Sequence, residues 1–478
     1  MNEVPVSVVP VEQIERAVGC EAFERFKAST SDTRRRLGRS TIWHINSTAQ
    51  GGGVAEMLQS LLGYARGLDL DMRWLVIKGD PGFFELTKRL HNNLHGYDGD
   101  GGELGEQQHE HYEMTLSGNI KELLRMIRAR DIVVCHDPQT AGLVPALTKL
   151  GAKVVWRCHI GTDHLNDVVD RAWTFLARYI KPAQRYVFTR AAFMPSQLDH
   201  GKCVIIPPSI DPLSCKNQPM TPEVVQSILV KTGLIEGHNG QADPVFTRED
   251  GSRDQIQRCA DMIHLGRAPK PDRPLIVQVS RWDHLKDPVG VMRGFAQYVS
   301  GENASLVLAG PNVSAVADDP EGMQVLEDVE TAWRNLPHEV RKHVHLACLP
   351  MADRQENAAI VNALQRHATI VVQKSLNEGF GLTVTEAMWK SRPIVASAVG
   401  GIQDQIENEV HGLLVDDPTD LHAFGVALKR FLHDPDFARK AGERAHVRAR
   451  DHFLFTRHLS QYLALFDELD PNPRIQVA

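Results

Sequence analysis

The sequence has no uninterrupted apolar run near the roughly 20 residues that a helix needs to span a bilayer. It has no excess of positive charge either, because its 53 Lys and Arg residues face 60 Asp and Glu residues and leave a formal net charge of −7. Proteins that bind nucleic acid non-specifically usually carry a basic excess. We therefore expect neither a membrane nor a nucleic acid as a partner, while a local basic pocket for a phosphorylated ligand stays open.

Metal-binding patterns are also scarce. The seven cysteines are scattered and form no CxxC pair, so they indicate neither a zinc knuckle nor a disulfide framework. The pairs His91 with His95 and His109 with His111 lie in polar sequence without a further ligand pattern. We therefore expect no bound metal. Charge and proline interrupt the first residues where a signal peptide has an apolar segment, which predicts a cytoplasmic protein.

Short β-branched runs alternate with amphipathic helical stretches along almost the whole chain. Many of the runs are apolar at every position, as in strands that are covered on both faces. Such alternation predicts an α/β protein with doubly wound, Rossmann-like parallel sheets. The expected strands are residues 41–45, 74–77, 131–135, 153–157, 186–189 and 203–207, then 275–279, 305–309, 343–347, 369–373 and 393–397.

A polar segment rich in Gly, Pro, Asn and Asp separates the two series of strands and marks a domain boundary. We expect an N-terminal domain of residues 1–214 and a C-terminal domain of residues 215–455, with an insertion near 237–272. Two doubly wound domains that face each other would hold a ligand in a central cleft between the carboxyl ends of their strands.

The most informative motif is EGFGLTVTE, residues 378–386, which follows an expected strand and runs into a helix. Free backbone N–H groups and the helix dipole make such a turn suitable for an anion. Glu378 lies in the turn, and Glu386 lies one to two turns into the helix, where it could accept hydrogen bonds from sugar hydroxyls. Either glutamate alone could merely complement the dipole, but the whole motif points to a ligand.

Three further motifs follow expected strands. Arg281 and Lys286 lie five residues apart in one loop, where they could grip a diphosphate or form a solvated basic pair. Glycines 51–53 separate a strand from a helix and would let a ligand approach the backbone. His136 and His159 end two strands, with packing and function equally open for each.

These motifs resemble a retaining glycosyltransferase of family 4 with the GT-B fold. The resemblance rests on EGFGLTVTEAM, on the Arg-x4-Lys loop and on the turn at Gly400-Gly401-Ile402. Within that family, HINSTAQGGGVAEML, HDPQTAGL, WRCHI, PPSIDPLSCKN and QVSRWDHLKDP resemble the glycosyltransferring trehalose synthases, which join nucleotide-activated glucose to free glucose. The resemblance also implies that the final helix, residues 456–478, returns to the first domain.

Carried over by position, the resemblance implies a role for each motif. Arg281 and Lys286 hold the donor diphosphate, and Glu378 and His159 contact the donor glucose. Donor-binding groups are further expected at Gly51, Gly52, Gly53, Gly379, Phe380, Gly381, Leu382, Thr383 and Glu386, and acceptor-binding groups at Asn46, His136, Asp137 and Gln139. This sequence departs from the family pattern at Gly161, where the resemblance leads us to expect an acidic residue.

Alternatives remain open at this level. The nucleotide of the donor could be ADP, UDP or GDP. The motifs would also suit a trehalose phosphorylase that uses glucose 1-phosphate. They would equally suit a related transferase whose acceptor is another sugar or a polyol. A catalytically silent sugar-nucleotide-binding regulator is a third interpretation, but it need not keep Arg281, Lys286, Glu378 and Glu386 together. A homodimer is also left open.

Overall fold

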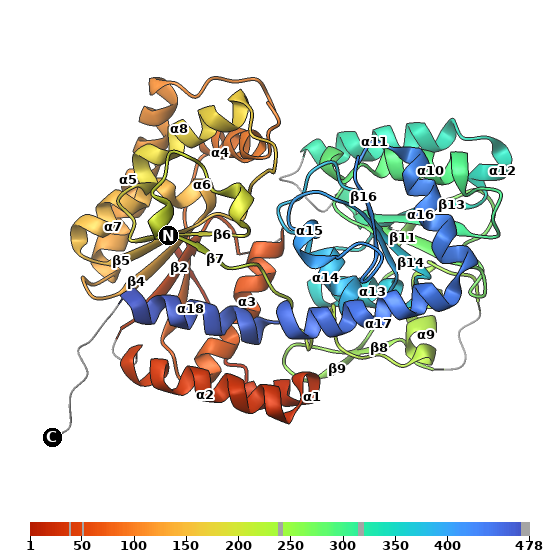
Figure 1. The fold of residues 1–478 in the computed structure, drawn as a ribbon, viewed down its shortest axis with the longest axis horizontal. Helices are drawn as coiled ribbons and strands as arrows, with labels where there is room; N and C mark the ends of the chain where they lie inside the picture. The colour runs from red at the N-terminus through yellow and green to blue at the C-terminus, as the bar shows by residue number, and fades with distance from the viewer. Residues whose placement is uncertain (38–39, 50–51, 238–241, 314–319, 470–478) are drawn as a thin grey trace. The chain divides into compact units, whose positions relative to one another are not determined.

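The computed structural model describes residues 1–37, 40–49, 52–237, 242–313 and 320–469 (Figure 1). The chain forms two compact units. One comprises Met1–Ser209 and the chain from Phe453 onward, and the other comprises Ile210–His452. The sequence predicted that the chain passes from one unit to the other at 214/215 and at 455/456, a few residues later than the structure shows in each case.

The first unit is a seven-stranded sheet in the order β1-β3-β2-β4-β5-β6-β7. All neighbours are parallel except β1, which pairs antiparallel with β3 at the edge. The strands are β1 Asn2–Val4, β2 Ile42–Asn46, β3 Met72–Val76, β4 Ile132–His136, β5 Lys153–Arg157, β6 Arg185–Phe188 and β7 Cys203–Ile205. The expected doubly wound sheet is confirmed, but β1 was missed because three residues are too short to show a period.

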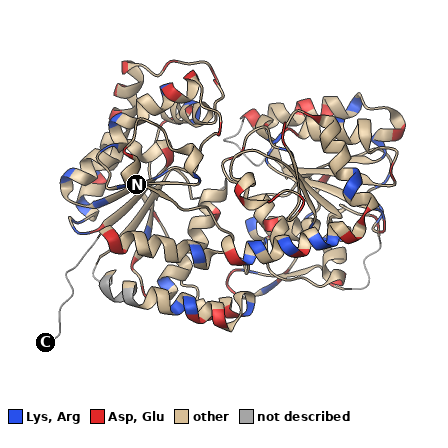
Figure 2. Ribbon diagram, viewed as in Figure 1, with Lys and Arg blue, Asp and Glu red and all other residues tan. Residues whose placement is uncertain are grey.

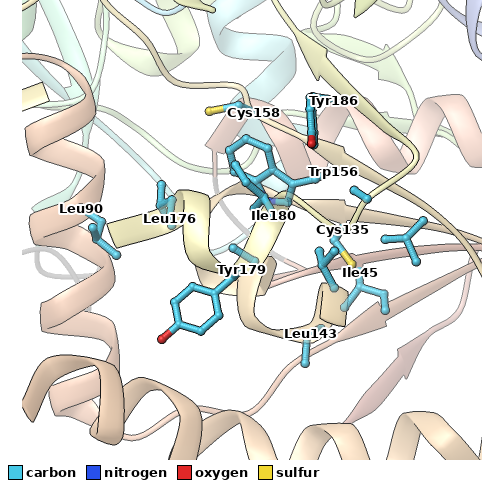
Figure 3. Packing of buried hydrophobic residues seen from close by; sticks show 14 of the residues in the cluster. Ile45, Leu90, Cys135, Leu143, Trp156, Cys158, Leu176, Tyr179, Ile180 and Tyr186 are labelled. Carbon is cyan, nitrogen blue, oxygen red and sulfur yellow. The ribbon is translucent and has the colours of Figure 1, made fainter. Parts of the chain in front are cut away.

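Helices cover both faces of this sheet (Figure 1). One face carries α2 Cys20–Leu37, α3 Gly52–Gly67 and α18 Phe455–Leu469, with α1 Glu15–Val18 beside α2. The other carries α4 Pro81–Leu94, α5 Glu106–Met126, α6 Asp137–Thr140, α7 Val144–Leu150 and α8 Asp167–Ile180. Figure 3 shows part of the core on that second face, which includes Trp156 and Tyr186 of the sheet and Leu176 and Ile180 of α8.

The second unit is also a seven-stranded sheet, in the order β10-β13-β12-β11-β14-β15-β16. Its strands are parallel except β10, which pairs antiparallel with β13. They are β10 Asp261–Ile263, β11 Leu275–Val279, β12 Ser305–Pro311, β13 Val344–Leu349, β14 Ile370–Gln373, β15 Ile394–Ser397 and β16 Leu413–Val415. The strand order reverses at β11, which makes β11 and β14 the switch point where ligands of doubly wound folds bind.

Its helices again lie on both faces of the sheet. One group is α9 Pro222–Thr232, α13 Arg354–His367, α14 Leu382–Trp389, α15 Ile402–Gln405 and α17 Pro435–His452, and the other is α10 Pro288–Tyr298, α11 Pro320–Arg334, α12 His338–Arg341 and α16 Leu421–His433. Basic and acidic residues are interspersed along the helices of both units (Figure 2).

The expected insertion at 237–272 contains a two-stranded hairpin and an edge strand. β8 Val245–Thr247 and β9 Arg253–Gln255 form the hairpin, and β10 then joins the main sheet. Arg248 ties the hairpin to the rest of the unit, since its guanidinium pairs with Asp254 at 2.6 Å and with Asp353 at 2.5 Å. The insertion is therefore built into the second unit, although residues 238–241 lie outside the described part.

Candidate functional site

Two loops meet at the switch point of the second sheet. The loop after β11 carries Lys286, and the loop after β14 carries Glu378. The Lys286 ammonium lies 2.6 Å from Glu378 Oε2, and both side chains are largely buried. The same carboxylate oxygen also lies within reach of Gln373 Nε2, at 3.4 Å, and of Ser375 Oγ, at 3.3 Å. The sequence motifs that lie 92 residues apart thus form one cluster.

Backbone contacts hold the turn around Glu378 in place. Gly381 has φ +86° and caps α14 without a side chain, so the helix begins directly at the turn. Gln405 Nε2 donates to the Phe380 carbonyl, and Gln405 Oε1 accepts from Thr385 Oγ1 at 2.6 Å. Within the described residues, nothing accepts a hydrogen bond from the Leu382 and Thr383 amides. These N–H groups are available to an anion.

Arg281 takes a different position from Lys286. Its side chain is 53% exposed, and its guanidinium lies 3.2 Å from Asp283. The loop itself is rigidly built, because Asp283 accepts from the Leu285 amide at 2.8 Å and Gln278 donates to the Lys286 carbonyl at 2.7 Å. An exposed arginine on a fixed loop is able to swing onto a ligand phosphate without disturbing the core.

Glu386 lies on the buried side of α14, where it is only 6% exposed. Lys216 Nζ lies 3.7 Å from its Oε1. One helical turn further on, Lys390 is fully enclosed and donates to Asn217 Oδ1 at 2.9 Å and to Gln365 Oε1 at 2.8 Å. Burial lowers the pKa of Lys390. Lys216 and Lys390 were not predicted from the sequence, where the only signal was their place inside PPSIDPLSCKN and two residues after EGFGLTVTEAM.

A chain of histidines lies at the carboxyl edge of the first sheet. His44 Nδ1 lies 3.0 Å from His136 Nε2, and His136 Nδ1 lies 3.0 Å from His159 Nε2. The rings are stacked, with centroids 5.3 Å apart in both pairs. The structure therefore brings together the two predicted histidines and adds His44, which the sequence placed in a strand without a role.

Further buried polar groups extend this cluster. Arg157 is fully buried and donates to Thr189 Oγ1 at 3.3 Å, while its Nε and Nη1 have no partner among the described residues. His458 of α18 contacts Ser209 Oγ at 2.8 Å. Asp137 accepts from the His159 amide at 2.7 Å, and burial raises the pKa of Asp137 to about 7.

The remaining predicted positions divide into three cases. Asn46 is buried between the Trp74 indole, which donates at 2.8 Å, and the Thr48 carbonyl. Gln139 is half-buried in α6. Gly52 and Gly53 begin α3, whereas Gly51 lies outside the described residues.

Gly161 has a structural explanation. A Cβ atom there would lie 2.2 Å from the Phe193 ring, so an acidic residue would not fit without rearrangement. Two positions later, Asp163 pairs with Arg190 at 2.9 Å.

The buried histidines predict instability in acid. Burial lowers the pKa of His44 to about 3 and lowers the pKa values of His136, His159 and His458 well below the usual value. These histidines therefore bind protons near pH 6.5 in the unfolded chain but stay neutral in the folded unit. The free energy of unfolding consequently decreases as the pH falls from about 6.5. Asp137 acts in the opposite direction, because its raised pKa lets the folded unit hold a proton that the unfolded chain releases, and it therefore offsets part of the slope of stability against pH.

This slope can be measured by urea unfolding between pH 7 and pH 4.5. A His44→Gln variant should lose about one proton, or about 1.4 kcal/mol per pH unit, from the slope. The control is the His164→Gln variant, because His164 is exposed and none of the described contacts involves its ring, so the slope should stay unchanged. A pH-independent free energy of unfolding over this range would contradict the prediction.

No three His, Cys, Asp or Glu side chains are grouped for a metal ion within the described ranges. In the same part of the chain, none of the helices combines the length and the hydropathy of a membrane span.

Comparisons with known proteins agree with this architecture. Residues 44–195 match the family described as trehalose synthase, N-terminal domain, and residues 265–448 match the family described as glycosyl transferases group 1. A trehalose synthase of Pyrococcus horikoshii is 33% identical over 438 residues, covering 90% of each chain. A trehalose synthase of Rubrobacter xylanophilus is 34% identical over 444 residues, covering 91% of this chain and 92% of the relative.

A solved structure shows the same fold at much lower identity. The α,α-trehalose-phosphate synthase (UDP-forming) from Burkholderia xenovorans, in complex with glucose-6-phosphate, has a TM-score of 0.66 and 15% identity, covering 90% of this chain and 99% of that one. The two Rossmann-like units are thus those of the GT-B fold. Together with the two trehalose synthases, these matches establish that the chain belongs to the trehalose synthase family of GT-B glycosyltransferases.

Proposed function

We propose that the protein is a retaining glucosyltransferase that joins nucleotide-activated glucose to free glucose and so makes trehalose. The observation that supports this most strongly is the Lys286–Glu378 pair beside the open start of α14. It combines a cation and free amides for a diphosphate with a carboxylate for sugar hydroxyls. The similarity to trehalose synthases supports glucose as both donor and acceptor sugar.

In this mechanism the second unit binds the donor. Arg281, Lys286 and the amides of Leu382 and Thr383 stabilise the negative charge that develops on the departing diphosphate. Glu378 and the amides of residues 379–381 orient the glucose, assisted by His159. Glu386 accepts hydrogen bonds from the ribose. Glycines 51–53 also belong to the proposed donor-binding set.

The first unit binds the acceptor glucose through Asn46, His136, Asp137 and Gln139. The acceptor hydroxyl attacks the anomeric carbon from the side that the leaving group vacates, so the configuration is retained. The bond from the anomeric carbon to the diphosphate oxygen breaks as the new glycosidic bond forms, and that oxygen takes the acceptor proton. No covalent enzyme intermediate is required.

The proposal is tested by incubating the protein with ADP-, UDP- or GDP-glucose and free glucose. Equal amounts of nucleoside diphosphate and trehalose should appear with at least one donor. A parallel reaction with glucose 1-phosphate and glucose distinguishes a phosphorylase. Trehalose formed from glucose 1-phosphate alone, or no product from any donor, would contradict the proposed reaction.

We expect transfer to survive thorough treatment with EDTA. The reason is that Arg281, Lys286 and the start of α14 offer the diphosphate positive charge and N–H groups without a metal. The measurement compares initial rates before and after chelation, with added Mg²⁺ as the control. Complete loss of activity that Mg²⁺ restores would overturn the metal-independent mechanism.

A further inference from the structure

A pocket lies at the amino ends of the strands of the second sheet, whereas the proposed donor site lies at their carboxyl ends. Its volume is about 400 Å³. Arg273, Ser305 and His343 line it, and they lie at or just before the first residues of β11, β12 and β13. Arg281 instead follows the carboxyl end of β11. Five strand residues, or roughly 16 Å of β-structure, therefore separate the two sites.

The pocket is built by the inserted part of the chain. β10 pairs antiparallel with β13, from Asp261 opposite Cys348 to Ile263 opposite Leu346, so it ends at the amino edge. The chain at 264–274 then crosses the starts of β13 and β12 to reach β11, as the strand order requires. The Glu236 amide fixes this crossing segment by donating to the Pro269 carbonyl at 2.8 Å. A simple linker between two domains would not need this segment.

Positive charge dominates the lining. Arg267, Lys270 and Arg273 come from the crossing segment, and Glu236 is the only acidic residue in the lining. Lys342 also lines the pocket but shares Glu339, at 2.9 Å, with His338. None of these three cations takes part in an ion pair among the described residues, although Arg273 Nη1 donates to His343 Nδ1 at 2.5 Å. The pocket is therefore left with a positive charge that the protein itself does not balance.

A buried histidine with unused hydrogen-bonding groups points into the same place. His345 lines the pocket and is 1% exposed, yet neither ring nitrogen has a partner among the described residues. A buried polar group without a partner is costly, and native proteins rarely keep one without a reason. Burial, and to a smaller extent the neighbouring His264, His343 and Arg273, lower the pKa of His345 to about 3. An anion in the pocket would accept a hydrogen bond from the one ring N–H of the neutral imidazole and would offset the positive charge of Arg273.

We propose that this pocket binds a small organic phosphomonoester, such as a sugar phosphate or a nucleoside monophosphate, at a site separate from glucosyl transfer. Two negative charges suit three unpaired cations, of which two are arginines that can grip phosphate with two hydrogen bonds. Leu265, Ala268 and Pro269 provide an apolar wall for a carbon skeleton. A volume of about 400 Å³ lies in the range of small-molecule sites.

Calorimetric titration of the full chain at low salt tests the proposal with glucose 6-phosphate, AMP and inorganic phosphate. The Lys286→Ala variant serves as the background, because it weakens phosphate binding at the donor site. We expect the Lys286→Ala variant still to bind glucose 6-phosphate or AMP saturably. Adding Arg273→Gln and Lys270→Gln to that variant should weaken this binding at least 10-fold. The exposed Arg439→Gln change on α17 is the matched control and should leave binding unchanged.

Three results would overturn the proposal. The first is that none of the three probes binds saturably at a 10-fold molar excess over 1 mM protein. The second is binding that disappears with Lys286→Ala yet tolerates the Arg273→Gln and Lys270→Gln changes. The third is inorganic phosphate binding as tightly as both organic phosphates, which would remove the role of the apolar wall. Arg273→Lys, which keeps the charge, guards against misfolding and should retain more affinity than Arg273→Gln.

Discussion

Replacing Lys286 with alanine is expected to lower the rate of glucosyl transfer by about 10² to 10³, the usual cost of removing one group that stabilises developing negative charge. The Lys286 ammonium is the one cation held directly against Glu378, at 2.6 Å, among the contacts described for that carboxylate. Its loss removes the charge that faces the leaving diphosphate and leaves Glu378 with only neutral partners. Initial rates at saturating donor measure the effect.

The matched control is Lys429→Ala. Lys429 is an exposed lysine of α16 whose nearest acid, Glu302, lies 3.9 Å away, and its loss should not change the rate. Circular dichroism should show that both variants fold. A Lys286→Ala protein that transfers glucose at a near-normal rate would refute the role given to this lysine. Arg281→Ala should also lose most turnover, and its greater exposure makes misfolding an unlikely explanation.

Replacing Gly400 with alanine is expected to disrupt the donor site from outside the motif that carries Glu378. Gly400 has φ +50°, and a Cβ atom there would lie 1.6 Å from the Glu378 carbonyl oxygen. The turn at residues 378–381 would have to move, which separates Glu378 from Lys286. We expect about 2–4 kcal/mol of lost stability from overpacking and backbone strain, together with loss of nearly all transfer activity.

Gly301→Ala provides the control for this change. Gly301 has open space around its Cβ direction and no positive φ, so alanine should be tolerated there. Thermal unfolding and initial rates of both variants decide the matter. A Gly400→Ala protein with normal stability and normal rate would show that the turn does not depend on this close approach.

The candidate donor site was largely predictable from the sequence because its parts are local. Each of the two key loops follows a strand with a clear apolar pattern, and β11 and β14 lie beside each other in any sheet of this order. The expected bounds of β5 and β11 agree with the structure residue for residue. Periodicity, turn composition and the two glutamates of EGFGLTVTE are properties of short segments, so they can be read without the fold.

Other features depend on contacts between distant parts of the chain. His458 reaches Ser209 across 249 residues, and Lys216, near the start of the second unit, reaches Glu386 in its α14. The short strands β1 and β10 exist only because an edge of a sheet offers them hydrogen bonds. None of these has a local pattern that would announce it.

The sequence by itself determined the two α/β series, the insertion between them and the residue types at the donor site, because each rests on local periodicity and turn chemistry. Only the tertiary structure decided that Lys286 pairs with Glu378, that His44, His136 and His159 form one chain, and that the insertion encloses a basic pocket. The physical reason is that these arrangements follow from strand order and long-range packing. Both are fixed by the free energy of the whole fold, which no short segment records.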